Sequence, residues 1–160
     1  MFIKRIVICG SISFYPEFVK IQRALGEARI SSVIPSNDDE VKHKMSEAMF
    51  QDYKRKASFE HIKRIRDPRT VAILAVNIDK HNIHSYIGPN TFAEIAIAFA
   101  QSKKIYLLME MPEIYKDELT AWRTIPLHGD LYQLINDFDR SQMGQGIQLE
   151  LFTDILSEEL

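Results

Sequence analysis

The feature that most constrains the fold is one short apolar run, residues 70–77, with the sequence TVAILAVN. The run is too short for an ordinary helix, and every position between its ends is aliphatic. A strand of this kind is apolar on both faces, so it is expected in the interior of a sheet that is covered on both sides. Sheets covered on both sides are mainly parallel and are built from strands that alternate with helices. The run therefore predicts an α/β fold.

Hydrophobic periodicity along the rest of the chain supplies the alternating elements. Further strands are expected at residues 2–9, 30–35 and 104–109, with a short edge strand at 124–126. Helices are expected at residues 16–28, 41–65, 92–100, 113–122 and 130–139. The second of these stretches is one helix or two helices with a break, and its apolar positions include Met49, Phe59 and Ile65. The prediction is a single-domain, doubly wound, flavodoxin/Rossmann-like sheet of five mainly parallel strands with helices on both faces. This domain would occupy residues 1–140, and residues 141–160 would form a linker and an acidic, apolar C-terminal tail.

The composition narrows the class of protein. The chain has 160 residues, of which 46% are hydrophobic and 26% charged, as in a globular domain. The net charge of −2 gives no general attraction to nucleic acid or to membranes, so no direct contact with either is expected. The lone Cys9 excludes an intramolecular disulfide and fits a reducing compartment. No run reads as a signal peptide or a membrane span, and we expect a cytoplasmic protein.

One carboxylate stands out in the apolar helix at residues 92–100. Glu94 is the only residue of that stretch that is not apolar. Two interpretations are open. Thr91 and Glu94 fit the spacing of a capping box, in which the two side chains satisfy the first amides of the helix. Alternatively, Glu94 is a nucleophile at the mouth of a cleft, where the N-terminus of the helix would keep it ionised and rigidly placed.

Two loops are expected at the carboxyl edge of the sheet, where ligands of such folds bind. The first, residues 9–15, contains small residues that can approach a phosphate or a sugar, without the pattern of a Walker loop. The second, residues 78–90, carries Asp79, His81 and His84, whose spacing matches no known metal site. We therefore expect no metal and no cofactor. The candidate ligand contacts in the two loops and at the start of the helix are Gly10, Ser11, Ser13, Gly88, Asn90 and Thr91.

Three segments carry a resemblance to a known family: residues 8–13 (ICGSIS), 88–100 (GPNTFAEIAIAFA) and 103–108 (KKIYLL). Together they resemble the nucleoside 2-deoxyribosyltransferases and the related 2′-deoxynucleoside 5′-phosphate N-hydrolases. The resemblance implies that Glu94 attacks the anomeric carbon of the sugar, and that Gly10 and Ser11 contact the substrate and its phosphate. It also implies a homo-oligomer, because relatives complete their sites with a neighbouring subunit.

The sequence departs from the family pattern at three places. Ser13 stands where the N-hydrolases have Arg, and Gly88 stands where the transferases have Asp. Residues 61–66 hold no acid, although the transferases place a second one at the end of that helix. Asp79, from a longer loop, is our candidate to replace a missing acid in catalysis, with His81 and His84 as further candidates for protonating the base. A basic stretch, residues 54–56 or 63–66, can form a lid or simply face solvent.

The expected activity is cleavage or transfer at the N-glycosidic bond of a (deoxy)nucleoside or nucleoside monophosphate, with Glu94 as nucleophile. The alternative is a nucleotide-binding module without catalysis. The tail contains the sequence QLELF, similar to peptides that dock on the bacterial replication sliding clamp, and its spacing equally fits packing on the body or on a second subunit. The candidate clamp contacts are Gln148, Leu149, Leu151 and Phe152.

Overall fold

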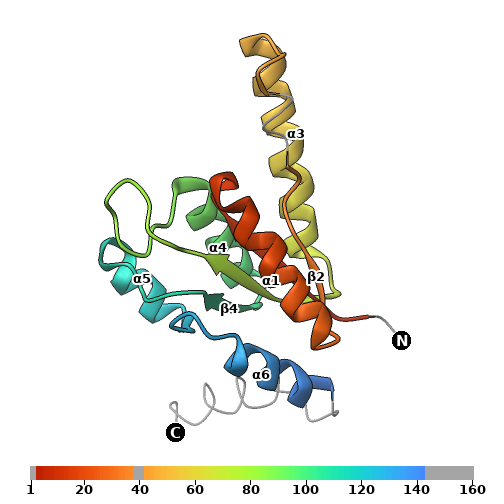
Figure 1. Cartoon of the computed structure of the whole chain (residues 1–160), viewed down its shortest axis with the longest axis vertical. Helices are drawn as coiled ribbons and strands as arrows, with labels where there is room; N and C mark the ends of the chain where they lie inside the picture. Colours follow the sequence, from red (N-terminus) through yellow and green to blue (C-terminus); the bar gives the residue numbers. More distant parts are fainter. Residues whose placement is uncertain (1–2, 38–41, 143–160) are drawn as a thin grey trace, which may run out of the picture.

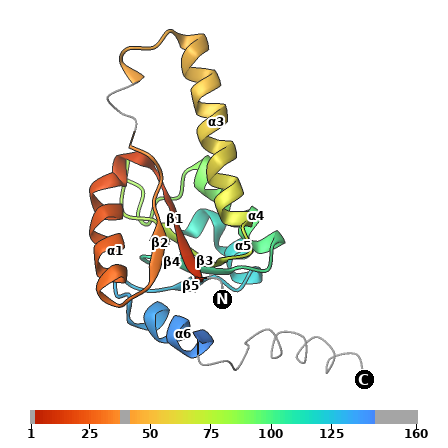
Figure 2. The same ribbon diagram turned by 90° about the vertical axis from the view of Figure 1, so that its right-hand side faces the viewer.

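The computed structural model describes residues 3–37 and 42–142 and shows a five-stranded sheet with helices on both sides (Figure 1, Figure 2). The strand order is β2-β1-β3-β4-β5, and each neighbouring pair is parallel. The expected doubly wound α/β fold is therefore confirmed. The strands are β1 (Arg5–Gly10), β2 (Ser31–Val33), β3 (Thr70–Val76), β4 (Lys104–Leu107) and β5 (Ile125–Pro126).

The helices follow the expected order along the chain. The first expected helix is preceded by a short 3-10 turn, and the helix expected at residues 113–122 is divided into a 3-10 turn and a short α-helix. The elements are η1 (Ile12–Phe14), α1 (Tyr15–Glu27), α3 (Glu47–Arg66), α4 (Pro89–Ala100), η2 (Glu113–Tyr115), α5 (Lys116–Ala121) and α6 (Tyr132–Gln142).

Two hydrophobic cores lie on opposite faces of the sheet. Alternation along β1 sends Ile6 and Ile8 to the face covered by α1 and α6, and Val7 and Cys9 to the face covered by α3, α4 and α5. The central strand β3 contributes buried side chains to both faces. Its continuous apolar sequence is explained by this position, with a parallel neighbour on either side.

The helix α3 extends well beyond the body of the molecule (Figure 1, Figure 2). It begins at Glu47 because Ser46 caps it, accepting a hydrogen bond from the backbone amide of Met49. Only its last part packs on the sheet, where His61 and Ile65 are buried. The apolar residues Met49 and Phe59 do not reach the core, since each is 58% exposed. Among the described residues, no helix combines the length and the apolar character needed to cross a membrane.

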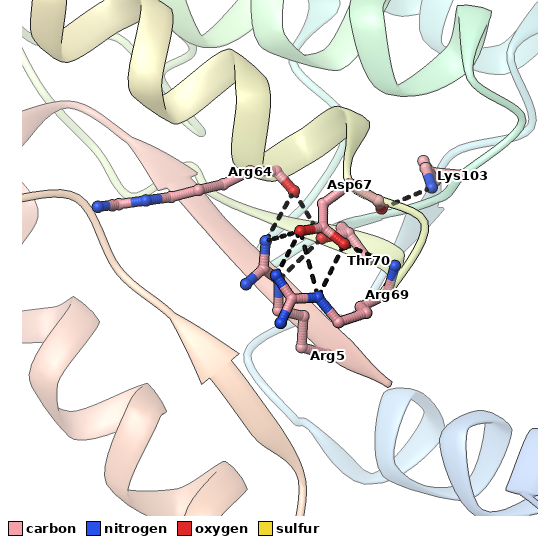
Figure 3. Close-up of polar contacts among 6 residues, drawn as sticks. All are labelled: Arg5, Arg64, Asp67, Arg69, Thr70 and Lys103. Carbon is pink, nitrogen blue, oxygen red and sulfur yellow. Dashed lines mark hydrogen bonds and ion pairs between the residues drawn. The ribbon is translucent and has the colours of Figure 1, made fainter. Parts of the chain in front are cut away.

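A polar cluster ties the amino edge of the sheet to the end of α3 (Figure 3). The Asp67 carboxylate accepts hydrogen bonds from the guanidinium groups of Arg5, at 3.1 Å, and Arg69, at 2.6 Å. The Lys103 ammonium donates to the backbone carbonyl of Asp67 at 3.1 Å. Hydrogen bonds from Arg69, reinforced by the charge of Arg5, hold the pKa of Asp67 well below its usual range. The cluster lies at the edge opposite the carboxyl ends of the strands, so its role is structural.

Replacing Asp67 by Asn should lower the thermal unfolding midpoint at neutral pH by several degrees. The depressed pKa of Asp67 means that the native state favours the ionised carboxylate over the protonated form. The stabilisation of the fold by this carboxylate is therefore fully present above pH about 4, and it is lost as the pH falls further. The difference between variant and wild type should therefore shrink in acid. Asp52, which pairs only with Arg55 on the exposed part of α3, is the control: Asp52→Asn should leave the midpoint unchanged. Equal midpoints for both variants would contradict the structural role.

Candidate active site

The helix α4 positions Glu94, and its start rules out the capping interpretation. Gly88 is the N-cap residue, in an extended conformation, and Pro89 occupies the first helical turn. Thr91 is therefore inside the helix and buried, and no side chain caps the first amides. The capping box expected from Thr91 and Glu94 is wrong because the Gly-Pro pair begins the helix earlier than Thr91. The Glu94 carboxylate is left available for another interaction.

Glu94 lies against Cys9 and His61, between α4, the end of β1 and the buried part of α3. Its Oε1 is 3.8 Å from Nε2 of His61, and that nitrogen is 3.6 Å from Sγ of Cys9. The Cys9 sulfur and the Glu94 carboxylate also lie within 4.8 Å of each other. Cys9 is fully buried, whereas the Glu94 side chain is 17% exposed. Glu94 is thus the member of this cluster that keeps some exposure.

Burial controls the protonation of this cluster. It raises the pKa of Glu94 to about 7, against the opposing effect of the Cys9 hydrogen bond. Burial, with the nearby Arg64 charge, lowers the pKa of His61 to about 4, so the imidazole is neutral. The pKa of the Cys9 thiol is raised well above its usual value, first by burial and then by Glu94.

The sequence analysis expects the helix N-terminus to keep Glu94 ionised, whereas burial raises the pKa of this carboxyl group to about 7. Glu94 lies in the second turn of α4, and the field of the helix dipole falls off within the first turn. Desolvation of the carboxylate is the larger effect. With a pKa of about 7, the carboxyl group is partly protonated and partly ionised at neutral pH. A group with a pKa in this range can serve as nucleophile or exchange a proton.

A hydroxyl and ammonium cluster lies at the same edge of the sheet. The Ser11 and Ser13 hydroxyls are 3.0 Å apart, and the Lys80 ammonium donates to Ser11 at 2.7 Å. Lys80 also lies over the aromatic rings of Phe14 and Tyr86, at 5.7 and 5.5 Å from their centroids. The two loops expected at the carboxyl edge are thus in contact. Their meeting point offers two hydroxyls and one positive charge to an anion.

Gly10 joins this cluster to Cys9, and its backbone requires a glycine. Its φ of +156° belongs to the region that other residues rarely adopt. A Cβ atom there would also approach the Phe18 ring and the Val76 carbonyl oxygen to 3.0 Å. The chain therefore turns sharply between the residue that contacts Glu94 and the serines that contact Lys80.

A second polar cluster, which we call the rim cluster, consists of Asp79, His84, Glu110 and His128. The Asp79 carboxylate contacts His84 Nδ1 at 2.9 Å, and Glu110 contacts His84 Nε2 at 3.5 Å and His128 Nδ1 at 3.4 Å. A hydrogen bond from the Ser85 amide and the bond with His84 lower the pKa of Asp79, while Asp79 raises the pKa of His84. The shifts have opposite effects: the surroundings favour the ionised form of Asp79 and the protonated form of His84.

The other predicted site residues occupy different environments. Asn90 is exposed in the first turn of α4, and Gly88 lies beside the Tyr86 hydroxyl. His81 packs edge-on against the ring of Tyr86 at 5.7 Å. The basic residues 54–56 are exposed on the part of α3 beyond the body. The tail residues 148–152 lie outside the described part of the chain.

Sequence reasoning missed three members of these clusters: His61, Lys80 and Glu110. His61 lies in a basic stretch of the sequence that was expected to face solvent. The apolar Ile65, one helical turn away, was the signal that this face of the helix is buried. Lys80 lies beside Asp79 in a polar loop where most side chains are solvated. Glu110 lies three residues beyond the end of β4, and its position near the carboxyl end of a strand was the signal that could have identified it.

Comparisons with known proteins identify no relative by sequence. No protein-family model matches the chain, and no curated protein matches it. Among solved structures, the chain is similar to a CMP N-glycosidase, BcmB, from Clostridium botulinum. The identity is 19%, the match covers 85% of this chain and 98% of that chain, and the TM-score is 0.47.

Proposed function

We propose that the protein cleaves or transfers at the N-glycosidic bond of a (deoxy)nucleoside or nucleoside monophosphate, with Glu94 as nucleophile. The observation that carries this proposal is the position of the Glu94 carboxylate. It takes no part in capping α4, it lies within 4.8 Å of the Cys9 sulfur at the carboxyl end of a central strand, and its side chain is 17% exposed. The sequence resemblance at residues 8–13 and 88–100 supports the same role.

The spacing of the clusters fits a substrate that is a sugar with a charged end. Cys9 lies near Glu94, and Ser11, two residues further along the chain, accepts a hydrogen bond from Lys80. Two residues span at most about 7 Å of backbone, so both groups are presented from the same end of β1. We assign the sugar to the Glu94 side and a 5′-phosphate to Ser11, Ser13 and Lys80. Charge-assisted hydrogen bonds from an ammonium group and hydroxyls are suited to a phosphate.

In the proposed reaction the ionised Glu94 carboxylate attacks the anomeric carbon. The bond between that carbon and the base nitrogen breaks, and its electron pair leaves with the base. A protonated side chain or solvent donates a proton to the departing base, and His84, whose pKa is raised by Asp79, is our candidate. Water then releases the free sugar, or a second base accepts it. The role of Asp79 is to hold the proton on His84.

The test is an assay of product formation. The full chain is incubated with nucleosides and their 5′-monophosphates, in ribo and deoxy forms, with and without a second free base. Chromatography then measures the free base and any exchanged nucleoside. We expect free base from at least one monophosphate, and faster release than from the matching nucleoside. No release from any member of the panel would contradict the proposed activity.

A nucleotide-binding module without catalysis is the second candidate. The observation that favours it is electrostatic: the pKa of Glu94 is set by burial and by the Cys9 thiol, and no second carboxylate is among its causes. The transferases that the sequence resembles use further acids. Saturable binding of a monophosphate, with the ligand recovered intact, would identify a module of this kind. Docking of such a module on the sliding clamp through residues 148–152 stays a prediction, testable by a pull-down with and without residues 141–160.

Replacing Lys80 by Met should weaken binding of the monophosphate selectively. Loss of one charge-assisted hydrogen bond costs about 1.5–3 kcal/mol, so KM for the monophosphate should rise by about tenfold to a hundredfold. The matching nucleoside has no phosphate, so its KM in the variant should stay within about twofold of the wild-type value. Lys20→Met on the exposed face of α1 is the control and should change neither value. Equal loss for nucleoside and monophosphate would contradict the assignment of Lys80 to the phosphate.

A further inference from the structure

We propose that Cys9, His61 and Glu94 form a binding site for Zn²⁺, and that the bound metal switches the proposed active site off. The sequence alone gave no expectation of a metal, because these residues are far apart in the chain. The fold brings them together from β1, α3 and α4, with one donor atom from each residue. The binding of metal can be tested by itself, whereas the inhibition rests on the proposed function.

The distances agree with tetrahedral coordination. The Cys9 sulfur is 3.6 Å from His61 Nε2, and that nitrogen is 3.8 Å from Glu94 Oε1. The three donor atoms all lie within 4.8 Å of one another. Ordinary zinc bond lengths place sulfur and nitrogen donors about 3.6 Å apart at a tetrahedral angle, and nitrogen and oxygen donors about 3.3 Å apart. A small movement of the Glu94 side chain completes this geometry.

The chemistry of the three donors selects the metal. A thiolate and an imidazole favour Zn²⁺ over Mg²⁺ or Ca²⁺, which prefer oxygen ligands. The His61 ring is neutral, so the lone pair of one of its nitrogens is free to coordinate. A thiolate and a carboxylate together carry two negative charges, and Zn²⁺ neutralises both in a site where uncompensated charge is costly. The fourth position is left for water, on the exposed side of Glu94.

The protein alone satisfies these polar groups incompletely. The Nδ1 atom of His61 is buried and has no hydrogen-bond partner among the described residues. The separation of 3.8 Å between His61 and Glu94 exceeds a hydrogen bond. A buried imidazole that makes so little use of its nitrogens lowers stability and calls for an explanation. The partner of Nε2 is the Cys9 sulfur at 3.6 Å, which is a weak hydrogen-bonding group. A metal on Nε2 would replace this weak contact with a coordinate bond and would leave Nδ1 as it is.

The rim cluster is the competing site for a metal, and it is less suitable. Its donors are two imidazoles and two carboxylates, with no sulfur, and its side chains are between 42% and 68% exposed. Asp79, His84 and Glu110 already pair with one another, so a metal would have to displace ion pairs that water also stabilises. We therefore place the zinc at Cys9, His61 and Glu94.

Coordination explains the inhibition directly. A Glu94 oxygen that donates its electron pair to zinc cannot use that pair to attack a sugar carbon. Zinc binding releases the proton of the Cys9 thiol to solvent, together with the Glu94 proton where one is present. No bond of the substrate is involved, and removal of the metal by a chelator restores the carboxylate. The site is thus a reversible block on the proposed nucleophile.

The experiment measures Co²⁺ and Zn²⁺ binding to the full chain without a histidine tag. Co²⁺ should give the ligand-to-metal charge-transfer absorption of a thiolate ligand, with one equivalent bound and displaced by Zn²⁺. Cys9→Ser and His61→Gln each remove a metal ligand and should each weaken Zn²⁺ binding by about a hundredfold or more. Loss of a residue that only hydrogen-bonds to a ligand already weakens metal binding by up to about a hundredfold. Circular dichroism checks that both variants are folded. His84→Gln, in the rim cluster, is the matched control and should bind Zn²⁺ like the wild type.

The outcomes separate the two proposals. Absence of the thiolate band, or binding that is lost in His84→Gln and kept in Cys9→Ser, overturns the zinc site. If the metal-free protein releases base, Zn²⁺ should abolish that release and a chelator should restore it, and release that continues with the site saturated overturns the inhibition. If the metal-free protein releases no base, the proposed function fails, and the spectra still decide the metal site.

Discussion

Glu94→Gln should reduce release of free base by at least about a thousandfold in kcat/KM. The amide cannot form a covalent bond to the anomeric carbon, and it carries no negative charge to stabilise the positive charge that develops on the sugar. A loss of this size corresponds to about 4 kcal/mol of transition-state stabilisation. Gln has nearly the same shape as Glu, so binding of the intact nucleotide should persist. Chromatography of the free base gives the rate, and calorimetry gives the affinity.

Two controls make the result specific. Glu110→Gln changes a carboxylate of the rim cluster and should lower the rate only modestly, since Glu110 acts on the proton of His84 and does not contact the sugar in our proposal. Glu118→Gln changes an exposed carboxylate on α5 and should leave the rate unchanged. Full activity in Glu94→Gln would exclude Glu94 as nucleophile. Equal losses in Glu94→Gln and Glu118→Gln would point to damage of the fold.

The fold was predictable because its signals are local. The apolar run of β3 identified the central strand, and the apolar positions of α1 identified the face that packs on the sheet. The element missed in part was α3. Its apolar residues Met49 and Phe59 are each 58% exposed although they lie in the same helix as the buried Ile65, so the apolar pattern alone could not show where the contact with the sheet ends.

The candidate site was only partly predictable, because it depends on contacts across the fold. Glu94 was identified by the contrast between one carboxylate and an apolar helix. Its partner His61 comes from a helix 33 positions earlier in the chain, and no spacing rule links the two. The contact between Lys80 and Ser11, separated by 69 positions, likewise exists only because β1 and β3 are neighbours. Parallel sheets create such sites by joining the ends of strands that are distant in sequence.

The protonation of Glu94 could not be predicted for a related reason. The position of a carboxylate near a helix N-terminus is visible in sequence and favours the ionised form. The desolvation that opposes it comes from burial among the elements packed around α4, which only the fold supplies. The two effects have opposite signs, and burial raises the pKa of Glu94 to about 7. This balance leads to a prediction about stability.

Glu94→Gln should stabilise the folded protein at neutral and alkaline pH, while it abolishes the activity. In the native state Glu94 has a pKa of about 7, raised from an ordinary value near 4.5. Between these two values the unfolded chain has lost the proton and the native state keeps it, so the wild-type stability falls as the pH rises. The fall ends above pH about 7, and the separation of the two pKa values corresponds to a total of about 3 kcal/mol. Gln does not titrate and escapes this loss.

The stability gain of Glu94→Gln should therefore depend on pH in a defined way. At pH about 4 the wild-type carboxyl group is protonated in both states, and the two proteins should unfold at nearly equal denaturant concentration. At pH about 8 the variant should be more stable by up to about 3 kcal/mol, measured by urea unfolding with a chelator present to keep the site free of metal. Glu118→Gln should show no such dependence, because Glu118 is exposed. A variant that is less stable than wild type at pH about 8 would show that the ionised carboxylate is favoured by its surroundings, and that Glu94 is a structural residue.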